Sequence, residues 1–331
     1  MGTSTRSQTG GKPSSQTASA PGKVILFGEH AVVHARPAVA VAVTQVRATA
    51  TVEPAPPGSG LTLVAPDVEK RISLGCLSSA SSAPQDEPLA AAARHTLTHL
   101  SSPQPDATVT ISSTIPIASG MGSGAAVSTA LVRALAGFLG HTLEPTQVSA
   151  IVFEVEKIHH GTPSGIDNTV IAFEQPIYFM HDHPIQRLTV GQPFTLLIGD
   201  TGTRSPTRRV VAHVRRAWER DPAHYDALFD QIGDIADEGR RVIEAGDVDA
   251  LGPLMDENHA LLIDLGVSSP QLDELVDAAR FSGALGAKLS GAGQGGNMIA
   301  LVESDLVEDV AEELMDAGAV RVIQTRITTT D

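Results

Sequence analysis

The chain has 331 residues, of which 42% are hydrophobic and 3% aromatic, and its formal net charge at pH 7 is −15. This length suits one large domain or two ordinary ones, because domains usually span roughly 100–200 residues. The acidity excludes a general nucleic-acid binder, which needs a basic face, and makes an anionic membrane a poor partner.

The first 19 residues are rich in Ser, Thr, Gly and Gln and contain no apolar run. We therefore expect a disordered tail over 1–19, and neither a signal peptide nor a membrane anchor. The single cysteine, Cys76, excludes an intrachain disulfide and suits a reducing compartment. No apolar run is long enough to cross a bilayer. These features predict a cytoplasmic protein.

The first half of the chain predicts strands, then helices. Strands are expected at 24–27, 38–43 and 47–52, and the Pro- and Gly-rich stretch 54–60 predicts a turn that closes a hairpin with 61–65. A small-residue loop follows at 78–88. The remaining elements of this half are expected at 89–100 (helix), 107–113 (strand), 124–139 (helix) and 145–159 (helix).

The second half begins with a compact apolar run at 194–199 that predicts a strand. Helices are then expected at 207–218, 225–245, 248–265, 270–282 and 306–318, and strands near 287, at 298–302 and at 320–327. Strands and helices mix without regular βαβ alternation, which favours an α+β fold. We place a domain boundary near 187–193, giving an N-terminal domain over 20–190 and a C-terminal domain over 191–331.

The glycine-rich segment 116–126 (PIASGMGSGAA) lies between an expected strand and an expected helix. Glycines let backbone N–H groups approach a polyanion, and the helix N-terminus adds a positive dipole end, so this arrangement predicts an anion site. The spacing also fits a dinucleotide-binding fingerprint, which leaves a dehydrogenase open. Against that alternative, residues 116–119 separate the strand from the glycines, and Glu144, the nearest acid for a ribose, falls beyond the helix. A tight packing turn is the third interpretation.

Two other glycine-bearing segments lie far away in the chain, at 21–30 (PGKVILFGEH) and 288–297 (KLSGAGQGGN). Together the three segments resemble the motifs of the GHMP small-molecule kinases, and the resemblance runs from about Ala20 to the C-terminus. It implies a two-domain GHMP kinase fold of the α+β class, with a ribosomal-S5-like N-terminal domain and a ferredoxin-like C-terminal domain. It also implies an ATP-dependent kinase of a small hydroxylated metabolite.

The segment 156–168 (EKIHHGTPSGIDN) is similar to the mevalonate kinase version of this family. The resemblance implies transfer of the ATP γ-phosphoryl group to the primary hydroxyl of mevalonate, giving 5-phosphomevalonate for isoprenoid biosynthesis. Asp167 would be the base that takes the hydroxyl proton, and Glu156 would be a Mg²⁺ ligand. These residue types suit phosphoryl transfer, which relies on positioning and charge neutralisation. Taken alone, Asp167 could equally form an Asx turn and Glu156 a solvated helix face.

The same resemblance implies the other site residues. Lys23 would act in catalysis beside Asp167 and the attacking oxygen, and Thr207 would contact the reacting region. Glu29 and His30 would bind substrate, as would Gly291 and Ala292 together with Lys23 and Asp167; His30 could instead be a core histidine. The nucleotide would lie on Pro116, Ser119, Gly120, Met121, Gly122, Ser123, Gly124 and Ala125.

Gly124 departs from the family pattern, in which a serine hydroxyl at this position is a Mg²⁺ ligand. Water could take the place of that hydroxyl, because Mg²⁺ commonly keeps several waters. Alternatively, Ser123 could reach inward as the metal ligand alongside Glu156.

Two further alternatives remain open. A phosphorylated acceptor, as in a phosphomevalonate kinase, would need extra cations in the pocket, and Arg204 or Arg208 could supply them. The chain could also be a non-catalytic GHMP-like sensor, which Gly124 favours and the intact Lys23 and Asp167 oppose. The expected partners are a small-molecule substrate, with ATP and Mg²⁺, and a second copy in a homodimer, but neither nucleic acid nor membrane.

Overall fold

The computed structural model describes residues 14–74, 87–117, 119–160 and 163–328 of the chain. Cys76 and most of the loop expected at 78–88 lie outside these residues. The strands are β1 (Gln16–Phe27), β2 (Ala38–Pro54), β3 (Leu61–Ala65), β4 (Lys70–Leu74), β5 (Ala107–Ser113), β6 (Ile177–Phe179), β7 (Gln186–Arg187), β8 (Phe194–Asp200), β9 (Gly286–Ser290), β10 (Asn297–Val302) and β11 (Arg321–Ile327). The helices are α1 (Pro88–His99), α2 (Ser123–Phe138), α3 (Pro145–His160), α4 (Ile166–Phe173), α5 (Thr207–Arg220), α6 (Pro222–Ala245), α7 (Val248–Asp264), α8 (Pro270–Phe281) and α9 (Val307–Asp316), with short 3₁₀ turns η1 (Ala31–His34) and η2 (Pro66–Val68).

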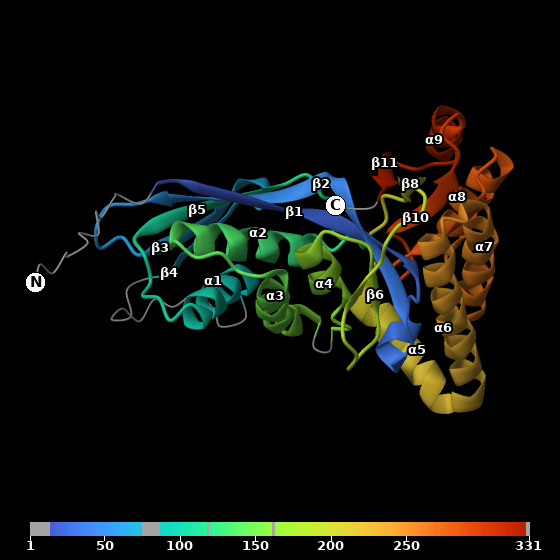
Figure 1. Ribbon diagram of the computed structural model, residues 1–331, viewed down its shortest axis with the longest axis horizontal. Coiled ribbons are helices and arrows are strands. Elements are labelled where there is room, and N and C mark those ends of the chain that lie inside the picture. The colour runs from blue at the N-terminus through green and yellow to red at the C-terminus, as the bar shows by residue number, and fades with distance from the viewer. Residues whose placement is uncertain (1–13, 75–86, 118, 161–162, 329–331) are drawn as a thin grey trace, which may run out of the picture.

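The first of two sheets is built around the long strand β2. Within the described residues it has seven strands in the order β4-β3-β5-β2-β6-β7, and β1 pairs with the other edge of β2. Helix α2 packs directly on β1 and β2, and α1, α3 and α4 pack around α2 (Figure 1). Alternation explains this layering, because Ala48, Ala50 and Val52 are buried on the helix-facing side of β2.

Two expectations for this region are wrong. The expected hairpin does not form, because β3 pairs parallel with β5 and antiparallel with β4. The expected tail over 1–19 also ends too late, because β1 already begins at Gln16, which pairs with Val52. The strands expected at 38–43 and 47–52 are parts of β2, and the β1 register shifts between them, from Gly22 opposite Val43 to Pro21 opposite Arg47.

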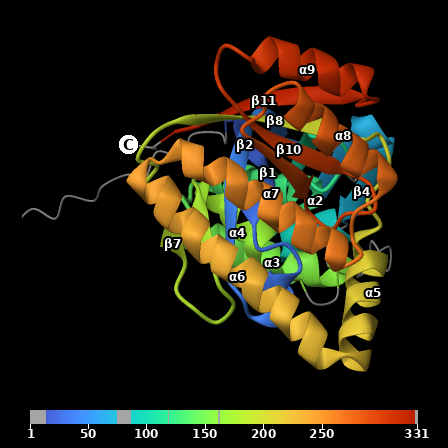
Figure 2. The ribbon, with the colours of Figure 1, turned by 90° about the vertical axis from the view of Figure 1, so that its right-hand side faces the viewer.

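The second sheet has four strands in the order β11-β8-β10-β9 within the described residues, and all of its pairings are antiparallel. Helices α7, α8 and α9 pack on it. Figure 2 shows α6 and α7 running side by side, with α5 at the far end of α6. This α+β architecture confirms the predicted fold class. It is not the parallel sheet of a dinucleotide-binding domain, so the dehydrogenase alternative is wrong.

Helix α6 joins the two halves of the molecule, because it packs on β1, β2 and η1 as well as on α7. Glycine makes the close approach possible: a Cβ at Gly239 would lie 2.5 Å from the ring of Phe27. The chain passes from the first sheet to the second between Arg187 and Phe194. The division into two domains at that interval stays a prediction.

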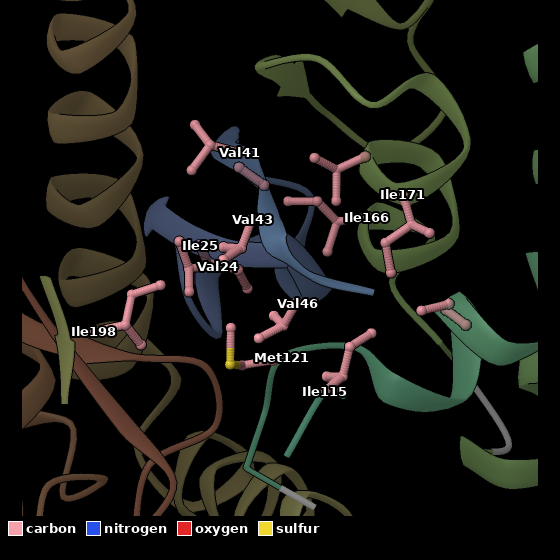
Figure 3. Packing of buried hydrophobic residues seen from close by; sticks show 14 of the residues in the cluster. Val24, Ile25, Val41, Val43, Val46, Ile115, Met121, Ile166, Ile171 and Ile198 are labelled. Carbon is pink, nitrogen blue, oxygen red and sulfur yellow. The ribbon is translucent and has the colours of Figure 1, made fainter. Parts of the chain in front are cut away.

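The apolar core forms one cluster that includes residues of β1, β2 and β8. Figure 3 shows part of it, with the side chains of Val24, Val46, Ile115 and Met121 among those labelled. Met121 is 1% exposed, so its side chain packs in the core. No helix in the described part of the chain is long and apolar enough to span a membrane.

Candidate functional site

The three glycine-bearing segments and the segment 156–168 meet around one cavity of about 820 Å³. Its wall is formed by β1 and the β1–η1 connection, the loop before α2, the first turns of α2 and α4, the side of α5 and the loop after β9. These segments are far apart in the chain. The cavity therefore exists only because the two sheets and α6 bring both halves together.

Lys23 and Asp167 form an ion pair in this cavity. Lys23 Nζ lies 2.9 Å from Asp167 Oδ1, and their side chains are 4% and 32% exposed. Asp167 occupies the first turn of α4, two residues after Gly165, whose φ of 89° favours glycine. Lys23 is held from β1, where its backbone N–H donates to the Met121 carbonyl at 3.1 Å. The pair thus places a buried cation next to a partly solvated carboxylate.

Gly122 makes room for the Lys23 side chain. Its φ is +68°, and an added Cβ would lie 2.8 Å from Ile171 Cδ1 and 3.1 Å from Lys23 Cγ. Only glycine satisfies both the backbone angle and this contact. The glycine-rich loop therefore helps to position the Lys23 side chain, and it also presents backbone N–H groups.

Glu156 contributes a second carboxylate from α3. It is 4% exposed, and burial together with the nearby charge of Asp167 raises its pKa to about 7, although Lys23 opposes the shift. A Cβ at Gly124 would lie 3.6 Å from Glu156 Oε1. Two carboxylates thus face a gap next to a position without a side chain. Among the described residues, no cluster of three or more His, Cys, Asp and Glu could hold a metal ion by itself.

Glu29 follows β1 and is bound within the protein rather than exposed in the cavity. Its Oε1 accepts a hydrogen bond from Lys288 Nζ, and both side chains are 0% exposed. Lys288 also donates to the Leu289 carbonyl at 2.7 Å. Burial raises the pKa of Glu29 and lowers that of Lys288, while their mutual attraction opposes both shifts. Glu29 nevertheless lines the cavity, and its Oε2 atom is buried with no hydrogen-bond partner in the structure.

His30 is fixed by an unusual backbone and one hydrogen bond. Its φ is 60°, which is uncommon for a residue with a side chain. Its Nε2 lies 3.0 Å from the Ala292 carbonyl, so the neutral ring donates there through Nε2–H. Burial lowers the pKa of His30 to about 4. His30 is therefore neutral at physiological pH.

This depressed pKa predicts a loss of stability in acid. Between pH 6.5 and about 4, the unfolded His30 takes up a proton that the folded ring does not, so the free energy of unfolding falls as pH falls. The slope is up to about 1.4 kcal/mol per pH unit. The urea concentration at the unfolding midpoint should fall between pH 7.5 and pH 4.5, and this fall should be larger for the wild type than for His30→Gln. The glutamine keeps a donor for the Ala292 carbonyl. Equal losses in both proteins would contradict the assignment.

The third glycine-bearing segment packs on the other two. Ser290 Oγ accepts from Ile25 N–H at 3.0 Å and donates to the Ile25 carbonyl at 2.9 Å, which ties β9 to β1. Asn297 Nδ2 donates to the Ser119 carbonyl at 2.8 Å. These contacts explain how Gly291 and Ala292 reach the cavity from the far end of the chain.

Most of the residues expected at the site line the cavity. Those that do are Lys23, Glu29, His30, Gly120, Gly122, Ser123, Gly124, Ala125, Glu156, Asp167, Thr207, Gly291 and Ala292. Three expected at the nucleotide, Pro116, Ser119 and Met121, do not; Ser119 Oγ donates to the Pro116 carbonyl instead. Arg204 does not line it either, whereas Arg208 does.

Sequence reasoning missed two features of the site. Lys288 begins the segment 288–297, but the sequence analysis gives it no role, because no local sequence pattern distinguishes a buried lysine from an exposed one. The cavity face of α5, including Arg209 and Arg215, was also missed. The arginine-rich composition of this helix was its only signal.

Comparisons with known proteins agree with this architecture. The model of the GHMP kinases N terminal domain matches residues 88–175, and that of the GHMP kinases C terminal region matches 240–320. Mevalonate kinase from Thermococcus sibiricus is 34% identical, with 92% of this chain and 94% of that protein covered. The Pyrococcus abyssi mevalonate kinase is 35% identical, covering 94% and 95%.

Among solved structures, L. major mevalonate kinase in complex with R-mevalonate superposes with a TM-score of 0.79. It is 28% identical, and the match covers 95% of this chain and 96% of that one. The matches to the mevalonate kinase relatives cover nearly the full length of this chain and of each relative, and both family models match. The chain belongs to the GHMP kinase family.

Proposed function

We propose that this chain is a mevalonate kinase, which transfers the γ-phosphoryl group of ATP to the primary hydroxyl of mevalonate. The observation that carries the proposal is the Lys23–Asp167 pair, held at 2.9 Å in a cavity that the glycine-rich loop and the first turn of α2 also line. The mevalonate kinase relatives, similar over most of the chain, support the choice of substrate.

In the proposed reaction, the acceptor hydroxyl oxygen attacks the γ-phosphorus while its proton passes to Asp167. The bond between the γ-phosphorus and its bridging oxygen breaks, and ADP leaves. Lys23 stabilises the negative charge that develops on the attacking oxygen, and its burial strengthens that interaction. Backbone N–H groups at the start of α2 would hold the phosphates. Most of the catalysis is positioning and charge neutralisation, as phosphoryl transfer requires.

The residues present fit a Mg²⁺ ion. Glu156 is a buried carboxylate whose raised pKa reflects burial and the nearby charge of Asp167, and Ser123 offers a hydroxyl in the same wall. Mg²⁺ is usually bound by one or two carboxylates, water and substrate phosphates, so a larger protein cluster is not needed. Bound there, the ion would neutralise charge on the ATP phosphates.

A coupled assay of ADP release tests the proposal. The purified protein is given ATP, Mg²⁺ and a panel of acceptors: mevalonate, phosphomevalonate, homoserine and galactose. We expect turnover with mevalonate far above the rest. A preference for phosphomevalonate would mean that phosphomevalonate, rather than mevalonate, is the substrate. Nucleotide binding without turnover on any acceptor would support a non-catalytic sensor. The expected homodimer and cytoplasmic location stay predictions.

Gly124 has no side chain where the family pattern has a serine, and this difference predicts the effect of introducing a serine. Gly124 lies in the first turn of α2 without a positive φ, so Gly124→Ser should fold normally. Its hydroxyl would lie near Glu156 and replace one metal-bound water. We expect the Mg²⁺ concentration for half-maximal activity to fall, by at most about tenfold because Mg²⁺ accepts water readily, with kcat little changed.

Gly124→Ala is the matched control, because it adds the Cβ without the hydroxyl. It should not lower the Mg²⁺ requirement. A folded Ser variant that loses activity at saturating Mg²⁺ would instead show that the phosphates need the bare backbone at Gly124.

A further inference from the structure

The stretch of β1 that carries Lys23 is paired in regular register with β2 over a short distance only. Residues 22–25 lie opposite residues 40–43, and the register shifts at both ends of this stretch. Bulges of this kind bend a strand and re-aim its side chains. Lys23 and Ile25 are two positions apart, so they share one face of the strand, and both line the cavity. The direction of the Lys23 side chain therefore depends on what fixes this stretch.

The outer edge of β1 meets side chains and loops instead of another strand. Among the described strands, β1 pairs only with β2, so its outward backbone groups need other partners. The Lys23 N–H donates to the Met121 carbonyl at 3.1 Å. At Ile25, one hydroxyl serves both outward groups: Ser290 Oγ accepts from the N–H at 3.0 Å and donates to the carbonyl at 2.9 Å. A hydroxyl can do both, because it carries a donor and acceptor lone pairs.

Ser290 is itself held firmly in the C-terminal half of the chain. It pairs with Asn297 of β10, and the neighbouring Leu289 N–H donates to His259 Nδ1 of α7 at 3.3 Å. Ser290 is 5% exposed, so water has little access to replace its hydroxyl. Strand β9 thus provides a fixed point against which this part of β1 is set.

We infer that Ser290 is a positioning residue for Lys23 and that it acts through the backbone of Ile25. By fixing both outward groups of Ile25, the hydroxyl sets the course of the strand two residues away from Lys23. That course brings Lys23 Nζ to its place 2.9 Å from Asp167 Oδ1. The inference rests on the proposed function, in which Lys23 stabilises the charge on the attacking oxygen. It adds that a hydroxyl from the far end of the chain holds this cation in register.

The first test compares Ser290→Ala with wild type by ADP release from ATP and mevalonate. We expect kcat to fall roughly 10- to 100-fold, because displacing a catalytic group by about 1 Å costs up to this much. KM for mevalonate and KM for ATP should stay within about twofold, the pattern of an interaction made only in the transition state. Ser290→Thr keeps the hydroxyl and suits a strand, so it should retain most of the wild-type kcat.

Leu314→Ala is the control for lost stability. Leu314 is a 0% exposed residue of α9 that does not line the cavity, and its truncation destabilises a protein at least as much as the loss of one buried hydroxyl. Thermal unfolding should therefore show a lower Tm for both Ser290→Ala and Leu314→Ala. Only Ser290→Ala should lose kcat.

Hydrogen exchange followed by NMR tests the position of the strand without any substrate. In Ser290→Ala the Ile25 N–H loses its partner, whereas the Lys23 N–H keeps the Met121 carbonyl. We expect both amides to exchange about tenfold faster, relative to the Ile111 amide of β5, since losing a hydrogen bond makes local opening easier. Faster exchange at Lys23 would show that the whole stretch 22–25 has loosened.

The remaining outcomes decide the inference. A folded Ser290→Ala protein with near-normal kcat would overturn it, as would unchanged exchange at Lys23. An equal loss of kcat in Leu314→Ala would reduce the effect to general stability, and a Ser290→Thr protein as impaired as Ser290→Ala would assign it to shape and not to the hydroxyl; either result also overturns the inference. Absence of wild-type turnover on mevalonate would instead overturn the proposed function, and the exchange rates would still decide whether Ser290 holds the strand.

Discussion

Replacing Asp167 by Asn is expected to lower kcat by about 10²–10⁴, the usual contribution of a general base. Asn keeps the size of the side chain but cannot take the hydroxyl proton as the Asp167 carboxylate can. In the wild type, Asp167 Oδ1 lies 2.9 Å from Lys23 Nζ. The fold should survive, because Asp167 is 32% exposed, its charge in the first turn of α4 is worth only about 0.3–1 kcal/mol, and the Glu156 carboxylate remains near enough to Lys23 for their charges to attract. Steady-state kinetics on mevalonate, with calorimetry of ATP binding, check both expectations.

Asp182→Asn is the control for this experiment. Asp182 is an exposed carboxylate outside the cavity, with 89% of its side chain exposed, so the same chemical change there should leave kcat within error. Near-normal turnover of a folded Asp167→Asn protein would remove Asp167 from the role of base. A parallel loss of ATP affinity would indicate that the carboxylate acts on the nucleotide.

The sequence predicted the order of elements well wherever local signals agree with the packing. The strand at 107–113 and the helix at 124–139 were found nearly at their observed bounds, because alternation and a glycine-rich start mark them. The α4 helix was missed, since its eight residues follow a Gly/Pro loop that reads locally as a turn. The prediction of a hairpin was wrong because β3 pairs with β5. No local sequence pattern encodes a partner strand more than 40 residues away.

The candidate site divides in the same way. Lys23, Glu156 and Asp167 were predicted because their neighbours form recognisable motifs. The structure brings all three to one cavity, and their roles stay predictions. The Lys288–Glu29 pair and the cavity face of α5 depend on contacts between the two halves of the chain. Sequence periodicity shows which residues share a helix face, but it does not show what that face meets.

Replacing Lys288 by Met is expected to destabilise the protein by about 3–5 kcal/mol, because it leaves the Glu29 carboxylate buried without its cation. Both side chains are 0% exposed, so water cannot replace the lost partner. The double variant Glu29→Gln/Lys288→Met buries no charge. It should recover much of that loss, as charge-free replacements of buried pairs usually do.

The pH dependence separates this electrostatic cause from simple loss of packing. Without Lys288, burial raises the pKa of Glu29 further, so the folded state keeps a proton that the unfolded chain releases above its ordinary pKa of 4.5. The unfolded state then binds fewer protons, and stability falls as pH rises. Urea unfolding should therefore show Lys288→Met losing stability relative to the double variant between pH 5 and pH 8. A difference that stays constant over this range would mean that Met packs poorly at position 288 and that the buried charge is not the cause.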